Sequence, residues 1–234
     1  MTTPLADDIT AVEAATETLL ATVSRLTDAD LDHPSLCEGW TRGHVVAHLA
    51  RNAEAIARLV DWAVTGEPRE MYPGGQESRD AEIEAGAHRG AEEQVADLSS
   101  TAVALAQQLP LLARGTETAE VEGRGGFVIA SADLPFMRLR EVVYHHTDLD
   151  AGYSFSDVDG DLLARFIEDA VRRLSLSRRA PGLTLRPDEG GSWVVGDGTA
   201  VVTGSRAGLL RWLARRIPDG VASEGPLPEL PRGA

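Results

Sequence analysis

Two segments that are predicted to be helical carry imidazoles and a carboxylate at the spacing of metal ligands. Glu141 and His145 are four residues apart, so on an α-helix both side chains lie on one face and can bind a single ion. His48, on a separate predicted helix, is the candidate for a third ligand. Three protein ligands drawn from histidine and carboxylate leave one coordination position open, which is typical of a catalytic zinc.

The first of these helices, predicted over residues 41–66, places His48 and Asn52 within an apolar stripe. The stripe is formed by Val45, Leu49, Ile56, Leu59, Val60 and Ala63. A polar group that faces a core must be hydrogen-bonded or coordinate an ion, because stranding it costs about 1–3 kcal/mol. We therefore favour His48 as a ligand, with a hydrogen-bonded core histidine as the alternative. His44, at the edge of the stripe, and Asn52 are candidates for cofactor binding.

The second helix leaves the choice between its two adjacent histidines open. One face carries Phe136, Leu139, Val142, Val143, His146 and Leu149. The opposite face carries Met137, Glu141, Tyr144, His145 and Asp148. Periodicity alone therefore favours His146 as the buried imidazole. The pattern permits Glu141 and His145 to face a site, but a surface contact between these two side chains is the alternative.

Four segments together resemble the mycothiol-dependent maleylpyruvate isomerase family, and the resemblance covers nearly the whole chain. They are Cys37 to Leu49 with its Gly-Trp-Thr turn, Tyr72 to Gly75 with Arg79-Asp80 following, Arg140 to Gly152, and Leu209 to Leu213. The resemblance implies a DinB-like four-helix bundle followed by a small α/β domain. It also implies mycothiol as cofactor and zinc, or another divalent metal, held by His48, Glu141 and His145. These motifs are more specific for the superfamily than for the isomerase activity.

The resemblance further implies a reaction. The metal binds the mycothiol sulfur and lowers the pKa of the thiol, and the thiolate adds to the cis double bond of maleylpyruvate. Rotation and elimination then give fumarylpyruvate, which feeds gentisate degradation. Two alternatives remain: a mycothiol S-transferase that conjugates the thiol to electrophiles, and a non-catalytic binding module. The binding module is disfavoured because it needs no open metal site.

The predicted elements give an α+β protein with a bundle domain over residues 1–152 and an α/β domain over residues 153–234. The expected bundle helices are 7–26, 41–66 and 76–109, together with a fourth that Asp133, Leu134 and Pro135 begin with a cap and an early proline. Residues 116–131 are too irregular for a secure strand and are a candidate flap. In the second domain we expect helices 157–177 and 205–217 and strands 182–186, 192–195 and 200–203.

Charge limits the partners of this chain. The formal net charge of −15 argues against nucleic-acid binding. All 22 basic residues are arginines, so a carboxylate substrate must be bound by guanidinium groups, which form bidentate pairs. Arg79, next to the connector that follows the second helix, and Arg216, at the end of the last helix, are the candidates for the two carboxylates of a maleylpyruvate-like substrate.

The remaining features concern compartment and assembly. No apolar run reaches the length of about 18 residues that a membrane span needs, and the acidic N-terminus lacks a basic secretory start. Cys37 is the only cysteine, which excludes an intramolecular disulfide and suits a reducing cytoplasm. We expect a cytoplasmic monomer without membrane or nucleic-acid partners, in which Cys37 is the rival nucleophile to an external thiol.

Overall fold

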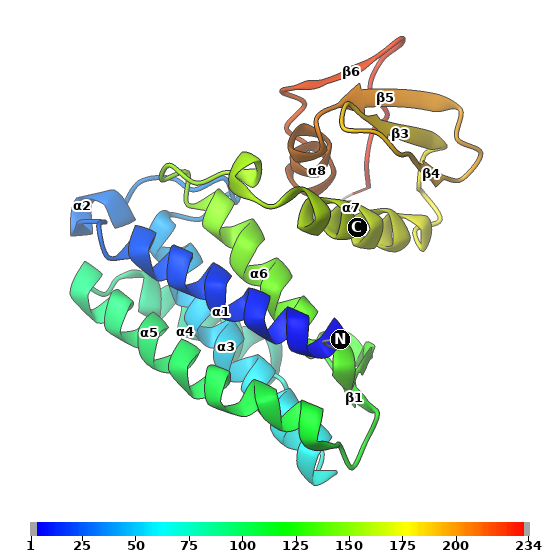
Figure 1. The fold of residues 1–234 in the computed structure, drawn as a ribbon. Coiled ribbons are helices and arrows are strands. Elements are labelled where there is room, and N and C mark those ends of the chain that lie inside the picture. Colours follow the sequence, from blue (N-terminus) through cyan, green and yellow to red (C-terminus); the bar gives the residue numbers. More distant parts are fainter. Residues whose placement is uncertain (1–3, 232–234) are drawn as a thin grey trace. The chain divides into compact units, whose positions relative to one another are not determined.

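The computed structural model describes residues 4–231 and divides into two compact units between Ala151 and Gly152. This division lies one residue from the boundary that the sequence predicts. The combination of a helical unit and a unit with a small sheet confirms the expected α+β class (Figure 1). Within residues 4–231, no helix combines the length and hydropathy that crossing a bilayer requires.

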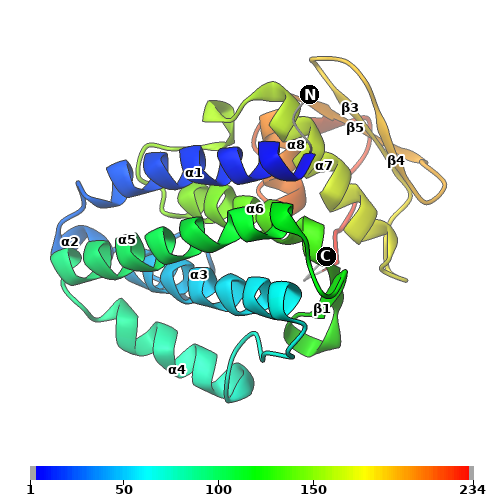
Figure 2. The same cartoon turned by 60° about the horizontal axis from the view of Figure 1, so that its bottom comes forward.

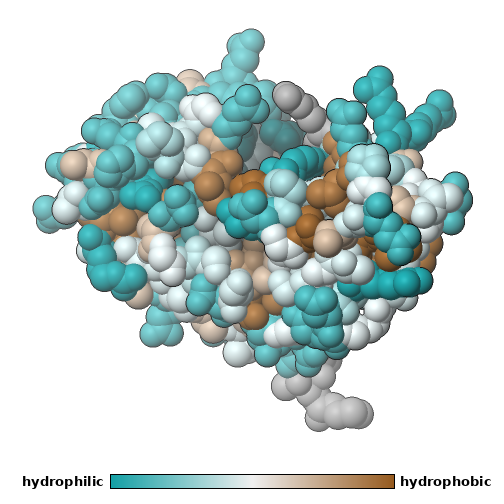
Figure 3. All heavy atoms as spheres, turned by 90° about the horizontal axis from the view of Figure 1, so that it is seen from above, coloured by the Kyte–Doolittle hydropathy of each residue, from teal (hydrophilic) through white to brown (hydrophobic). Residues whose placement is uncertain are grey.

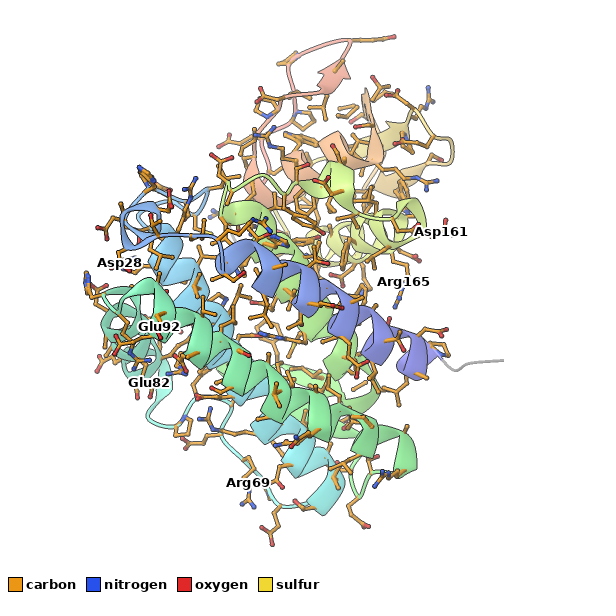
Figure 4. All side chains as sticks on the ribbon, turned by 60° about the vertical axis from the view of Figure 1, so that its left-hand side comes forward. Asp28, Arg69, Glu82, Glu92, Asp161 and Arg165 are labelled. Carbon is orange, nitrogen blue, oxygen red and sulfur yellow. The ribbon has the colours of Figure 1, made fainter. Side chains whose placement is uncertain are left out.

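The N-terminal unit is built on four long helices that pack in the cyclic order α1, α6, α3, α5 (Figures 1 and 2). The helices of the unit are α1 (Pro4–Val23), α2 (Asp28–Leu31), α3 (Arg42–Thr65), α4 (Gly75–Ala87), α5 (Ala91–Gln108) and α6 (Leu134–Asp148). Fully buried aliphatic side chains such as Leu19, Leu49 and Leu98 form the core between the four long helices. Exposed charged residues, among them Asp28 and Glu92, lie on the outside of this unit (Figure 4).

The single helix expected over residues 76–109 is two helices, α4 and α5. The chain breaks between them, and Gly90 in extended conformation begins α5. The buried amide of Gln94 stabilises the break, because its Nε2 donates to the carbonyls of Ala87 (3.1 Å) and Arg89 (3.0 Å). The break lets α4 pack against α3. The contact is close, since a Cβ at Gly86 would lie 2.8 Å from the Cβ of Ala47.

The segment between α5 and α6 contains a short hairpin, although the sequence pattern there was too irregular to predict a strand. Its elements are η1 (Leu109–Arg114), β1 (Glu120–Glu122), η2 (Arg124–Gly126), β2 (Val128–Ala130) and η3 (Ser131–Asp133). Strands β1 and β2 are antiparallel. Helix α6 begins at Leu134 as expected, but Asp133 does not cap it with its side chain, because Asp133 ends the preceding 3₁₀ turn in a helical conformation.

The C-terminal unit contains a four-stranded sheet in the order β4-β3-β5-β6, with two helices. Its elements are η4 (Phe155–Asp157), α7 (Gly160–Ser175), β3 (Leu183–Pro187), β4 (Trp193–Val195), β5 (Ala200–Gly204), α8 (Arg206–Arg215) and β6 (Val221–Ser223). Strand β3 is parallel to β5 and antiparallel to β4, and β6 is antiparallel to β5. Strand β6 is a three-residue edge strand that the sequence analysis did not predict. On the face of the chain that Figure 3 shows, groups of hydrophobic side chains lie between hydrophilic ones.

Candidate metal centre

Helices α3 and α6 supply the three predicted metal ligands. Thr41 fixes the start of α3 through a reciprocal cap: its Oγ1 accepts from the backbone N–H of His44, and its own N–H donates to Nδ1 of His44. Seven residues after this cap, His48 faces α6. Glu141 and His145 lie one turn apart on α6 and face α3, so the structure brings the three side chains together.

The distances within this group fit a divalent ion. Nε2 of His48 lies 3.1 Å from Oε2 of Glu141, and Nε2 of His145 lies 3.6 Å from the same oxygen. Two ligands that are each about 2.0–2.1 Å from a tetrahedral zinc lie about 3.3 Å apart. The potential ligand atoms of the three residues all lie within 4.8 Å of one another. Two imidazoles and one carboxylate are also the ligand types that zinc prefers.

A second carboxylate, that of Asp148, supports the ligand His145. Oδ2 of the fully buried Asp148 lies 2.8 Å from Nδ1 of His145 and also accepts from Sγ of Cys37 at 3.2 Å. A proton held on Nδ1 by this carboxylate leaves the Nε2 lone pair free for a metal. Sequence analysis did not assign Asp148, although its position three residues after His145 on the polar face of the helix was a usable signal.

The protonation of the group follows from burial and from hydrogen bonds. Burial and the neighbouring His145 lower the pKa of His48 to about 4, so His48 is neutral at pH 7. Burial raises the pKa of Glu141, but hydrogen bonds from His145 and His48 outweigh it and hold that pKa well below its usual value. Burial lowers the pKa of His145, but hydrogen bonds with Asp148, Cys37 and Glu141 outweigh it and hold that pKa well above its usual value. A metal must therefore displace a proton from His145 to bind.

The three ligands open into a cavity of about 440 Å³ within the N-terminal unit. Its lining consists of Cys37, Glu38, Trp40, His48, Asn52, Met71, Tyr72, Arg79, Arg124, Met137, Glu141 and His145. Arg124 comes from the hairpin segment that was a candidate flap. Trp40, whose ring centroid lies 5.5 Å from that of His48, was not assigned from the sequence. The sequence feature that could have identified Trp40 as a lining residue is its place in the Gly-Trp-Thr turn before α3.

Residues 12–150 match the family model described as "Mycothiol maleylpyruvate isomerase N-terminal domain". The chain belongs to this family. A crystal structure of the mycothiol-dependent maleylpyruvate isomerase is 31% identical in sequence and has a TM-score of 0.87, with 99% of each chain covered. The crystal structure of a histidine-to-alanine mutant of that enzyme gives the same values. A comparison with curated protein sequences finds no match.

In this member of the isomerase family, Arg79 on α4 reaches the ligand His48. Its Nη2 donates to Nδ1 of His48 at 3.1 Å, its Nη1 pairs with Asp80 at 2.7 Å, and its guanidinium lies 5.4 Å from the ring centroid of Tyr72. A neutral imidazole that binds metal through Nε2 carries its proton on Nδ1, so it cannot also accept from Arg79. With His48 bound to a metal in that way, the Nη2 donor is free for another acceptor in the cavity that Arg79 lines.

Arg216 lies in the C-terminal unit and ends α8 in the left-handed conformation, with φ of 60°. Its Nη1 donates to the carbonyls of Leu213 (2.7 Å) and Ala214 (3.3 Å), and its Nη2 donates to that of Pro231. Burial, together with the neighbouring Arg215 and Arg173, lowers the pKa of Arg216. The side chain thus has a structural role in its own unit, and a role in substrate binding stays a prediction.

The histidines adjacent to the ligands have other contacts. His44 uses Nδ1 at the cap of α3, and its Nε2 lies 3.1 Å from Oε2 of Glu84. His44 is not among the described residues that line the cavity, and its cofactor role stays a prediction. His146 is buried, and its Nε2 lies 2.9 Å from Oγ1 of Thr22 on α1. The imidazole that periodicity selects is therefore buried against α1, whereas His145 faces the candidate metal centre.

Proposed function

We propose that this protein is a zinc- and mycothiol-dependent isomerase that converts maleylpyruvate to fumarylpyruvate. The observation that carries the proposal is the group of His48, Glu141 and His145 at a cavity, in a chain that matches a mycothiol-dependent maleylpyruvate isomerase over 99% of both lengths. Three ligands with room for a fourth are what a thiol-activating metal requires.

The residues around the cavity have distinct parts in this proposal. When bound, zinc supplies the positive charge that lowers the pKa of the thiol, so that thiolate exists at neutral pH. His48, Glu141 and His145 would hold the ion, and Asp148 holds the Nδ1 proton of His145 in place. Arg79 would pair with a carboxylate of the substrate, since it lines the cavity with a side chain that is only 10% exposed.

The chemical steps balance without an oxidant or reductant. The thiolate sulfur forms a bond to one carbon of the cis double bond, and the π electrons move to the conjugated carbonyl oxygen as an enolate. The former double bond is then a single bond and rotates. The enolate electrons return, the carbon–sulfur bond breaks, and the trans double bond forms with release of the thiolate. Donors that face the enolate oxygen lower the barrier, because charge develops there only during the reaction.

An ultraviolet assay of maleylpyruvate with desalted, zinc-loaded protein tests the proposal. We expect isomerisation only when mycothiol is added, with no net consumption of the thiol. Consumption of mycothiol by electrophiles without isomerisation would instead support the S-transferase alternative. Protein that binds neither metal nor thiol would contradict both and favour a binding module.

A further inference from the structure

Helix α6 carries a buried cation, Arg138, that is not one of the three candidate metal ligands. Arg138 is 1% exposed, and burial lowers its pKa to about 10, so it stays charged at neutral pH. Its Nη1 donates to the backbone carbonyl of Leu49 at 2.9 Å and to Oδ1 of Asn52 at 2.7 Å. Within residues 4–231, its Nε and Nη2 have no hydrogen-bond partner.

This contact fixes the orientation of the Asn52 amide. A guanidinium can only donate hydrogen bonds, so the atom of Asn52 that faces Arg138 must be the oxygen, and the usual ambiguity of an amide flip does not arise. The NH₂ group of Asn52 therefore points away from Arg138. Asn52 lies one turn after His48 on α3 and lines the same cavity. In the part of the chain that the structure describes, Arg138 is the only side chain bonded to this amide.

We propose that Asn52 donates a hydrogen bond from Nδ2 to the carbonyl oxygen of the substrate that becomes the enolate oxygen, and that Arg138 is the residue that positions it. This inference rests on the proposed isomerase function. The donor is neutral, so it does not compete with the metal for the thiolate. The positive charge on the other side of the amide polarises the N–H bonds and strengthens their hydrogen bonds to an anion. The proton stays on nitrogen throughout, and the enolate charge leaves when the thiolate is eliminated.

The decisive variant is Asn52→Asp. A carboxylate keeps the acceptor that Arg138 needs and pairs with its charge, so the thermal unfolding midpoint should not fall. It has no donor for the enolate oxygen, and we expect kcat to drop on the order of 10²-fold, as when one donor to a developing oxyanion is removed. If Asn52 served only to bind Arg138, kcat would be unchanged, and that result would overturn the proposal.

Changes at Arg138 separate positioning from structural support. In Arg138→Met the amide loses the partner that orients it, so we expect kcat to fall about 10-fold while KM for mycothiol and the zinc content stay near wild type. Arg138→Lys, which can also only donate, should recover most of this loss. A lower unfolding midpoint with unchanged kcat in Arg138→Met would mean that Arg138 is purely structural.

A readout independent of turnover is available because Asn52 is the only asparagine in the chain. Protein labelled with ¹⁵N-asparagine gives a single side-chain NH₂ pair in an NMR spectrum. Maleylpyruvate added without any thiol should shift this pair in the wild type. Unshifted resonances at saturating maleylpyruvate would overturn the donor role even if the enzyme is active, whereas shifted resonances in a protein without isomerase activity would overturn only the proposed function.

Discussion

At the scale of single residues, the candidate site depends on which of two neighbouring imidazoles faces the ligand group. The spacing of Glu141 and His145 predicts a shared helix face, and the apolar stripe of α3 indicates that His48 is enclosed. Sequence reasoning could not choose between His145 and His146. Helix α6 packs against α1 on one side and α3 on the other. Its apolar positions repeat on the side that faces α1, where His146 lies. The polar side that faces α3 and carries His145 gives no such pattern.

Metal analysis of histidine variants tests this assignment. We expect about one zinc per chain in the purified protein and none in His48→Ala or His145→Ala, because two remaining ligands hold zinc weakly. His44→Ala and His146→Ala should keep the metal, although His146→Ala should lower the unfolding midpoint through loss of its bond to Thr22. Stoichiometric zinc in both ligand variants, measured after dialysis, would remove His48 and His145 from the ligand set.

The pH dependence of the metal-free protein follows from His48. Its pKa is about 4 in the folded state against an ordinary 6.5, so between these values the unfolded chain binds the extra proton and stability falls as the pH is lowered. The other two ligands do not add to this slope. His145 has a raised pKa and is protonated in the folded and the unfolded protein below pH 6.5. Glu141 has a lowered pKa and is ionised in the folded and the unfolded protein above pH 4.5. Thermal melts with a chelator should therefore show a decline from pH 6.5 to 4.5 that is flatter in His48→Gln. Identical slopes in the two proteins would contradict this origin.

At the scale of elements, the sequence predicted the long helices well because their apolar positions repeat clearly. It missed the break between α4 and α5, since Gly90 lies in a stretch rich in alanine and glutamate whose helical pattern continues on both sides. That break matters for the site. It lets α4 pack against α3, where the missing side chain of Gly86 permits close contact, and α4 brings Arg79 to His48.

Arg79→Met tests what α4 contributes. We expect kcat/KM for maleylpyruvate to fall on the order of 10²-fold with zinc content and unfolding midpoint near wild type, because a charged hydrogen bond made to the substrate is worth about 2–5 kcal/mol. Arg79→Lys should recover activity only partly, since an ammonium does not reproduce the guanidinium fork. Arg69→Met, at an exposed arginine paired with Asp61 and Glu67, is the matched control and should leave kcat/KM unchanged. Equal kinetics for Arg79→Met and wild type would show that other arginines bind the substrate.

In the molecule as a whole, the short apolar runs separated by glycine turns after Gly152 predicted the change from a helical unit to a unit with a sheet. The three-residue strand β6 was missed because so short an edge strand leaves no alternation to detect. The choice between isomerase and transferase was also beyond sequence reasoning, since it depends on the shape of the cavity. Its lining comes from the continuous stretch from the turn before α3 to α4, from the hairpin segment and from α6.

Arg216 lies in the C-terminal unit, whereas the three candidate metal ligands lie in the N-terminal unit. Its three backbone acceptors lead us to expect a lower unfolding midpoint in Arg216→Met. If it also binds a substrate carboxylate, kcat/KM per folded molecule should fall on the order of 10²-fold. Arg211→Met, at a neighbouring arginine paired with Asp219, is the control. A change in the unfolding midpoint alone would leave Arg216 with only a structural role.

We expect His48, Glu141 and His145 to hold one zinc per chain, and this zinc to activate an external thiol. Titration of zinc into chelated, desalted protein, at fixed mycothiol and maleylpyruvate, measures both properties in one experiment. The isomerisation rate should start near zero, rise linearly and saturate at one zinc per chain. Cys37→Ser should give the same curve, since serine keeps a donor for Asp148. A full rate from the chelated protein would exclude the role of zinc, and a rate that needs Cys37 but not mycothiol would exclude the external thiol.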